Sequence, residues 1–191
     1  MLEGILVDLV PHGERFSAVE RGWINSEASF WADAGDRPVW SQAFYEREMA
    51  SRQERPSPSV HFGIQTKNGT PIGEIGIGDM HVHHRVAMIG AMIGDPQYWG
   101  GGYGTDALLL IVDYAFHWHD MRKLWLATMS PNVRVQRQMD KVGFKLETRQ
   151  RQATWIDGAW ADALTYGLLR EEWPGREAMI EKLGLRARQG E

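Results

Sequence analysis

The clearest periodic segment of the chain is residues 105–119, where apolar side chains recur every three or four positions. This spacing gathers apolar residues on one face and predicts an amphipathic helix. The face consists of Leu108, Ile111, Tyr114, Ala115 and Trp118. A second helix is predicted after Ser130, a favoured capping residue, with Pro131 at its first position. It should end at Gly143, because glycine readily adopts the left-handed conformation that closes a helix.

Shorter apolar segments predict a sheet that is mostly antiparallel. The predicted strands are residues 5–10, 60–66, 71–83, 86–93 and 123–129, with two more inside 155–169. Asn68-Gly69 and Asp157-Gly158 are typical of tight hairpin turns. Residues 60–94 should therefore form an antiparallel meander. Residues 14–53 predict one or two helices rich in aromatic side chains, which serve either as core anchors or as the lining of a pocket.

Composition fits one soluble domain. The 191 residues are 43% hydrophobic and 24% charged, which is ordinary for a globular protein. The absence of cysteine excludes a disulfide framework, a thiol nucleophile and a thiolate metal site. The net charge of −4 gives no electrostatic reason to expect nucleic acid as a partner. No segment has the pattern of a signal peptide or a membrane helix, so we expect a cytoplasmic protein without a membrane partner.

A glycine-rich turn joins a predicted strand to the clearest helix. Its residues are Trp99, Gly100, Gly101, Gly102, Tyr103, Gly104 and Thr105. Glycine lets backbone N–H groups approach a ligand closely, and a helix N-terminus adds a partial positive charge at the same point. The segment therefore predicts a cradle for an anion such as a phosphate, whereas the structural alternative is a turn that only permits tight packing.

Two common phosphate motifs do not fit this turn. A Walker loop needs a lysine after its last glycine, but Thr105 follows Gly104 directly. A dinucleotide fingerprint needs an acidic residue at the end of the next strand, and that strand ends Thr128-Met129-Ser130. The preceding strand also belongs to an antiparallel meander rather than to a βαβ unit.

Three segments together resemble the GNAT superfamily of N-acetyltransferases. Residues 99–104 resemble the coenzyme A motif, with Trp99 in place of the basic first residue, as in the branch that acetylates ribosomal-protein N-termini. The segment from Asn132 to Phe144 and the closing region from Trp155 to Trp173 resemble the same branch. The resemblance is specific from Ile89 to Trp173 and weak before residue 60.

The resemblance implies an α/β fold of the α+β type, a mixed and mostly antiparallel sheet flanked by helices. The sheet should be splayed at the strand before the glycine-rich turn, with pantetheine in the opening. We expect one domain over residues 1–191, with acceptor-side helices in 14–53 and an acetyl-CoA-binding core in 86–144. By position, the cofactor should meet the backbone of Met92, Ile93 and Gly94, the glycine-rich turn, and the side chain of Asn132.

The basic residues after Asn132 are candidates for the cofactor's phosphates. Arg134, Arg137 and Lys141 are spaced i, i+3 and i+7, which places them on one helix face. They could contact the ribose phosphate of coenzyme A, or they could form an ordinary solvated face.

The chemistry predicted is direct attack of an amine on a thioester, which needs a proton acceptor near the amine. Glu74 is the first candidate for the general base, Asp79 is the second, and Asn132 is a further catalytic candidate. Many family members have a tyrosine that acts as the general acid at the position of Met139. Methionine cannot donate a proton. Asp79, His81 and His83 alternate along a strand, but we expect no metal site because the family chemistry needs none.

The sequence therefore predicts an N-acetyltransferase that uses acetyl-CoA. The acceptor is a primary amine, either a protein N-terminus or a small amine, amino sugar or antibiotic. A non-catalytic acyl-CoA sensor is the alternative from another class, and a homodimer is possible on sequence alone. Neither the acceptor nor the oligomeric state follows from these residues.

Overall fold

The structure is a computed structural model that describes residues 1–32, 39–54 and 59–187. Its helices are α1 (Glu14–Glu20), α2 (Glu27–Ala32), α3 (Gln42–Glu54), α4 (Tyr103–His117), α5 (Val133–Val142) and α6 (Arg176–Leu183). Its strands are β1 (Leu2–Glu3), β2 (Val7–Pro11), β3 (Val60–Thr66), β4 (Pro71–His81), β5 (Val86–Ile93), β6 (Lys123–Met129), β7 (Lys145–Ile156) and β8 (Ala159–Leu169). Short 3-10 turns lie at Pro96–Tyr98 and Arg170–Glu172.

The eight strands form one sheet in the order β1-β2-β3-β4-β5-β6-β8-β7. Every neighbouring pair is antiparallel except β5 and β6, which run parallel. The connection between these two strands is α4, as expected for a parallel pair that needs a crossover. The predicted mixed, mostly antiparallel sheet flanked by helices is confirmed.

The parallel pair separates soon after it begins. Only Val86–Met88 pair with Lys123–Trp125, although β5 continues to Ile93 and β6 to Met129. Gly90 and Ala91 of β5 and Ala127 of β6 are exposed although these strands lie in the middle of the sheet. We call this opening, between residues 89–93 and 126–129, the β5–β6 splay. It lies at the strand before the glycine-rich turn, where the resemblance placed it.

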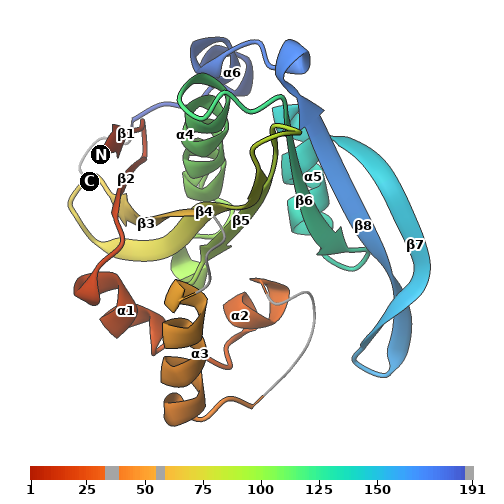
Figure 1. The fold of residues 1–191 in the computed structure, drawn as a ribbon. Helices are drawn as coiled ribbons and strands as arrows, with labels where there is room; N and C mark the ends of the chain where they lie inside the picture. The colour runs from red at the N-terminus through yellow and green to blue at the C-terminus, as the bar shows by residue number, and fades with distance from the viewer. Residues whose placement is uncertain (33–38, 55–58, 188–191) are drawn as a thin grey trace.

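The two faces of the sheet are covered by different helices. α4 contacts β2, β4 and β5, and its apolar residues share the main core with Ile75, Ile77 and Ile89. α1 contacts β4 and α2 contacts β5, and in Figure 1 α1, α2 and α3 gather together at the bottom of the view, apart from α4. Since side chains alternate along a strand, Glu74 points away from the face that holds Ile75.

Two glycines let the N-terminal helical region lie directly on the sheet. A Cβ atom at Gly63 on β3 would lie 2.4 Å from the ring of Phe16 in α1. A Cβ atom at Gly94 would lie 1.9 Å from the ring of Trp23, which follows α1. Any larger residue at either position would push these rings away from the sheet. α1 therefore lies against β4 and α2 against β5, the strand that borders the β5–β6 splay.

A buried carboxylate ties the start of the chain to α4. Asp106 in the first turn of α4 is fully buried, and its Oδ2 accepts hydrogen bonds from the backbone N–H groups of Leu6 and Val7 at 2.6 and 3.1 Å. Arg176 of α6 approaches the other oxygen of Asp106 at 3.7 Å. One side chain thus fixes β2 and α6 around the helix that follows the glycine-rich turn.

Several predicted boundaries differ in the structure. The clear helix is α4, and it begins at Tyr103, two residues before the prediction. α5 is capped by Asn132 rather than Ser130, whose hydroxyl accepts a bond from the Asp162 backbone instead. The predicted closing hairpin is present, but its first strand starts at Lys145. Hydrophobic periodicity predicts the middle of a helix or strand well, whereas the residue that caps a helix depends on tertiary contacts.

Replacing Asp106 with alanine should lower the free energy of unfolding by about 3 kcal/mol, because two buried N–H groups lose their acceptor. Urea denaturation followed by tryptophan fluorescence measures the change. Asp140→Ala, at an exposed position of α5, is the matched control and should change stability little. Equal stability of the two variants would contradict a structural role for Asp106.

Candidate active site

The glycine-rich turn has the backbone that its sequence predicts. Gly100 and Gly102 have φ angles of 75° and 92°, a region that other residues rarely adopt. Gly102 is the N-cap of α4, and no side chain caps the first turn of this helix. The first amides of a helix have no partner within the helix, so they can face a ligand. This arrangement fits an anion held by backbone donors.

Trp99 connects the turn to the neighbouring strand. Its indole Nε1–H donates a hydrogen bond to the carbonyl oxygen of Ile93 at 2.7 Å. The guanidinium carbon of Arg134 lies 3.8 Å from the centroid of the Trp99 ring, which is a cation–π contact. Arg134 therefore brings a positive charge from α5 to the position where the family motif has a basic residue. Burial lowers the pKa of Arg134, and the Glu27 carboxylate opposes this, but arginine stays charged at neutral pH.

The backbone of β5 turns alternately toward β4 and toward the β5–β6 splay. The Gly94 N–H donates to the carbonyl of Ile72 on β4, and the Met92 carbonyl lies so close to Gly73 that a Cβ there would be 2.0 Å from it. By alternation, Ile93 and Ala91 direct their backbone groups into the splay. Of the three residues predicted to meet pantetheine, Ile93 faces the opening, and Ala91 joins it as a position that the sequence did not single out.

Asn132 is the N-cap of α5, and Arg134, Arg137 and Lys141 all belong to this helix. Asn132 is 4% exposed, and its side-chain oxygen accepts a hydrogen bond from the Val135 N–H at 3.4 Å, which makes it a helix cap. Arg137 and Lys141 are exposed, and neither forms an ion pair with the part of the chain that the structure describes. Met139 is buried in the core at 2% exposure, so this position supplies packing rather than an acid.

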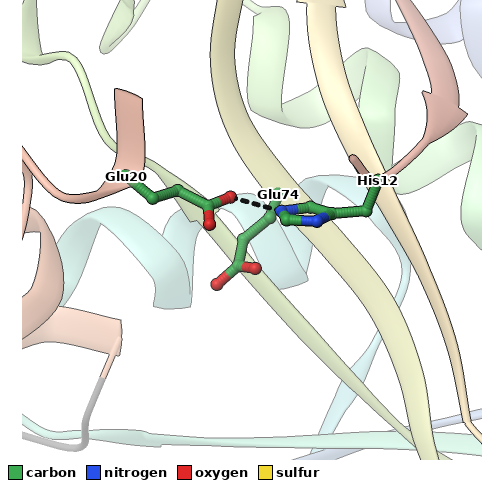
Figure 2. Close-up of side chains that lie close together, drawn as sticks. All are labelled: His12, Glu20 and Glu74. Carbon is green, nitrogen blue, oxygen red and sulfur yellow. Dashed lines mark hydrogen bonds and ion pairs between the residues drawn. The ribbon is translucent and has the colours of Figure 1, made fainter. Parts of the chain in front are cut away.

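Glu74 lies in a cluster with two residues that the sequence analysis did not identify. His12 follows β2, Glu20 ends α1, and Glu74 lies in the middle of β4. One ligand atom from each of them lies within 4.8 Å of the other two. Figure 2 shows the His12 ring joined to Glu20 by a hydrogen bond of 2.7 Å, with the Glu74 carboxylate beside both. Glu20 is 6% exposed, so most of its charge is sheltered from water.

The charges of the cluster act mainly on His12. The hydrogen bond to Glu20 raises the pKa of His12 above its ordinary value of 6.5, and the negative charges of Glu20 and Glu74 raise it further. Partial burial opposes this effect, because it disfavours the charged imidazolium. The net effect is a pKa of His12 above its ordinary value, so the charged imidazolium is favoured in the cluster.

Asp79, the second candidate base, lies far from this cluster. It is five residues beyond Glu74 on β4, about 17 Å along an extended strand. The pairing of β4 with β5 is irregular between Gly78 and His81, and Asp79 has a φ angle of 47°. β4 ends at His81, so His83 lies in the turn beyond the strand, but Asp79, His81 and His83 all line one cavity.

A cavity of about 730 Å³ lies at this end of the sheet. Its lining includes Asp79, His81, His83, His84, Arg85 and Arg122. The rings of His81 and His84 stack with centroids 4.1 Å apart. The cavity lies where β5 begins, whereas the β5–β6 splay lies where β5 ends. The structure therefore places Glu74, and not Asp79, beside His12 and Glu20 of α1.

No helix in the described part of the chain is long and apolar enough to cross a membrane.

Comparison with known proteins identifies the family. Residues 12–145 match the family model described as an acetyltransferase (GNAT) domain, which is more than half of the chain. The chain is 32% identical to "Probable N-acetyltransferase YjcK" of Bacillus subtilis over 131 residues, covering 66% of this chain and 71% of YjcK. It is 28% identical to the spermidine N(1)-acetyltransferase of Escherichia coli over 158 residues, covering 82% and 77% of the two chains.

Solved structures agree with this assignment. The spermidine N-acetyltransferase from Vibrio cholerae, in complex with CoA and spermine, superposes with a TM-score of 0.75 at 16% identity, covering 87% of this chain and 97% of that one. At this identity the likeness establishes the fold. Together with the family match, it shows that the chain belongs to the GNAT acetyltransferase family, which are acetyl-CoA-dependent acyltransferases.

Proposed function

We propose that this chain transfers an acetyl group from acetyl-CoA to a primary amine by direct attack in a ternary complex. The observation that carries the proposal is the β5–β6 splay, which has the glycine-rich turn at one end and Glu74 one strand away. Such an opening lets a ligand align with exposed strand backbone while its phosphates reach the N-terminus of α4. The residues present therefore fit the cofactor that the family uses.

The cofactor would be held at three places. The turn from Trp99 to Thr105 would bind the pyrophosphate, the backbone of β5 would bind the pantetheine, and α5 would offer Arg134, Arg137 and Lys141 to the ribose phosphate. Bound acetyl-CoA supplies a thioester, an activated acyl group with a thiolate leaving group. The chain's own residues would exclude water, place the amine and remove its proton, and Glu74, the first base candidate from the sequence, lies on the strand next to β5.

For the acceptor we propose a cationic amine of small size. This proposal is supported by the acidic cluster of Glu20 and Glu74, which attracts ammonium groups. Similarity to spermidine acetyltransferases points the same way. A protein N-terminus is the second candidate, because Trp99–Thr105 resembles the turn of the ribosomal-protein branch. An α-amine with pKa near 8 is about 1 kcal/mol from its neutral form at pH 7, whereas an amine near 10.4 costs more than 4 kcal/mol.

A thiol-release assay with acetyl-CoA tests the function directly. We expect release to depend on an amine, with spermidine acting at lower concentration than a peptide that begins with alanine or serine. Faster turnover of the peptide would instead identify protein N-termini as the acceptor. Tight acetyl-CoA binding without release in the presence of spermidine, the peptides or an aminoglycoside would instead identify a sensor.

Gly104→Val should weaken acetyl-CoA binding about tenfold or more, because its side chain would stand at the cradle. A Cβ at Gly104 would meet only Ile93 and Gln138, at 3.4 and 3.6 Å, so the variant should fold. Gly102→Val is a poorer test, because Gly102 has a positive φ. Calorimetry measures the affinity, and Gly78→Val, where a Cβ meets open space, is the control. Equal affinities of the two variants would move the phosphate site elsewhere.

Lys141→Ala should lower the affinity for coenzyme A roughly fivefold but change the affinity for dephospho-coenzyme A little, because only coenzyme A carries the ribose phosphate. Competition against labelled acetyl-CoA measures both affinities. The exposed Lys182 of α6 provides the matched control, Lys182→Ala, which should leave both unchanged. Equal weakening of the two ligands by Lys141→Ala would place the contact on another part of the cofactor.

A further inference from the structure

The cluster of His12, Glu20 and Glu74 is built by three separate elements around one point. The three ligand atoms lie within 4.8 Å of one another, so they fit within a circle of radius about 2.8 Å. An atom at the centre of this circle would lie within about 2.8 Å of each of them. This is the hydrogen-bond distance from a nitrogen to its acceptors. A primary ammonium group has three N–H donors. The carboxylates of Glu20 and Glu74 can accept from it, and the acceptor on the neutral His12 ring is Nδ1, because Nε2 donates its N–H to Glu20. A bound zinc ion would need contacts of about 2.0–2.2 Å, and therefore a tighter cluster at this limiting separation.

The cluster lies next to the strand that borders the β5–β6 splay. Glu74 is paired in register with Met92 of β5, and neighbouring strands are about 4.8 Å apart. The Phe16 ring of α1 packs 5.7 Å from the His12 ring and against Gly63, which pairs with Glu74. α1 therefore holds Glu20 and His12 over the same part of the sheet that carries Glu74. An amine bound there is one strand away from the expected thioester.

Proton affinity separates the roles of the three residues. Transfer of a proton from an alkyl amine with pKa about 10.4 to an ordinary glutamate, with pKa about 4.3, is unfavourable by about 10⁶-fold. Transfer to an imidazole with the ordinary pKa of 6.5 is unfavourable by about 8,000-fold, roughly a hundredfold less than transfer to glutamate, and the pKa of His12 is shifted in the direction that reduces this. The imidazole is therefore a better proton acceptor than either carboxylate of the cluster.

The charges that face His12 come from two elements. Glu20 of α1 and Glu74 of β4 are both acidic and both favour the imidazolium. Arg15, also in α1, is directed to Gln65 on β3, where its guanidinium donates a side-chain hydrogen bond. The hydrogen bond to Glu20 orients the ring and stabilises the protonated form, as expected of a positioning residue.

We propose that the His12–Glu20–Glu74 cluster binds the ammonium group of the acceptor and that His12 takes up its proton; this rests on the proposed function. One proton moves from the ammonium nitrogen to His12. The neutral nitrogen then bonds to the acetyl carbonyl carbon while the carbon–sulfur bond breaks. The thiolate receives the second proton of the nitrogen, and His12 returns the first to water, so the products are an acetamide, a thiol and one proton.

This role restricts the acceptor to one chemical class. Two carboxylates favour a primary ammonium without an acidic group close to it, and they disfavour a free amino acid, whose carboxylate would lie near Glu20 or Glu74. An alcohol lacks the positive charge and is a weak ligand here. Amines that carry further positive charge at a distance, as polyamines do, fit the cluster without repulsion from an acid.

The rate of spermidine acetylation as a function of pH tests the role of His12. The wild-type rate should rise with pH and level off above the pKa of His12, because the neutral imidazole is the base. In His12→Gln the plateau should be absent and the rate at pH 7 should fall about 10²–10⁴-fold, recovering as pH rises toward the pKa of the amine. Glu20→Gln should keep a plateau that begins at lower pH. His117→Gln, at an exposed position of α4, is the control.

Titration of His12 by nuclear magnetic resonance provides a readout that does not need turnover. Ethylammonium chloride should lower the pKa of His12, because a bound cation disfavours the imidazolium, and Glu74→Gln should weaken this effect. A wild-type pH profile from His12→Gln, or a His12 pKa insensitive to ethylammonium, would overturn the inference. If wild-type protein does not acetylate spermidine, the acceptor assignment fails, and the ethylammonium titration alone decides the role of the cluster.

Discussion

The structure depends on the separation of β5 and β6 after three paired residues. Inside a sheet, each strand normally satisfies the backbone groups of its neighbours, and leaving them without a ladder is costly unless another group bonds them. Here the Trp99 indole bonds the Ile93 carbonyl at one end of the opening, and the exposed Gly90, Ala91 and Ala127 border the rest. A ligand with alternating amide donors and acceptors, such as pantetheine, matches this edge in the way that a further strand would.

The elements around the opening each contribute a different kind of charge. The N-terminus of α4, together with Arg134 over Trp99, makes one end of it positive. The acceptor side, built by α1 on β3 and β4, is acidic through Glu20 and Glu74. In the proposed function, the anionic cofactor and the cationic amine would therefore be attracted to opposite sides of β5. Asp106 helps to fix this arrangement, because its hydrogen bonds hold the start of β2 to the first turn of α4.

The glycine-rich turn and the helix after it could be predicted from the sequence because they are local. The turn from Trp99 to Thr105 and the helix after it are contiguous, and glycine at Gly100 and Gly102 reflects backbone angles that few other residues adopt. The acceptor side could not be predicted in the same way. His12, Glu20 and Glu74 come from three elements, and only the packing of α1 on β3 brings them together. Asp79 looked equivalent to Glu74 in sequence, but the bulge near Gly78 and five residues of strand separate them. Asp106 carried no signal at all, because its partners lie about a hundred residues away.

A crystal structure of the protein with acetyl-CoA and a primary amine tests this account most directly. The account predicts pantetheine along Ile89–Ile93 in the β5–β6 splay, pyrophosphate at Gly100–Gly104, and the amine nitrogen beside His12 and Glu74. Acetyl-CoA bound in the cavity around His81 and His84, or an amine bound on the opposite face of the sheet beside α4, would contradict it.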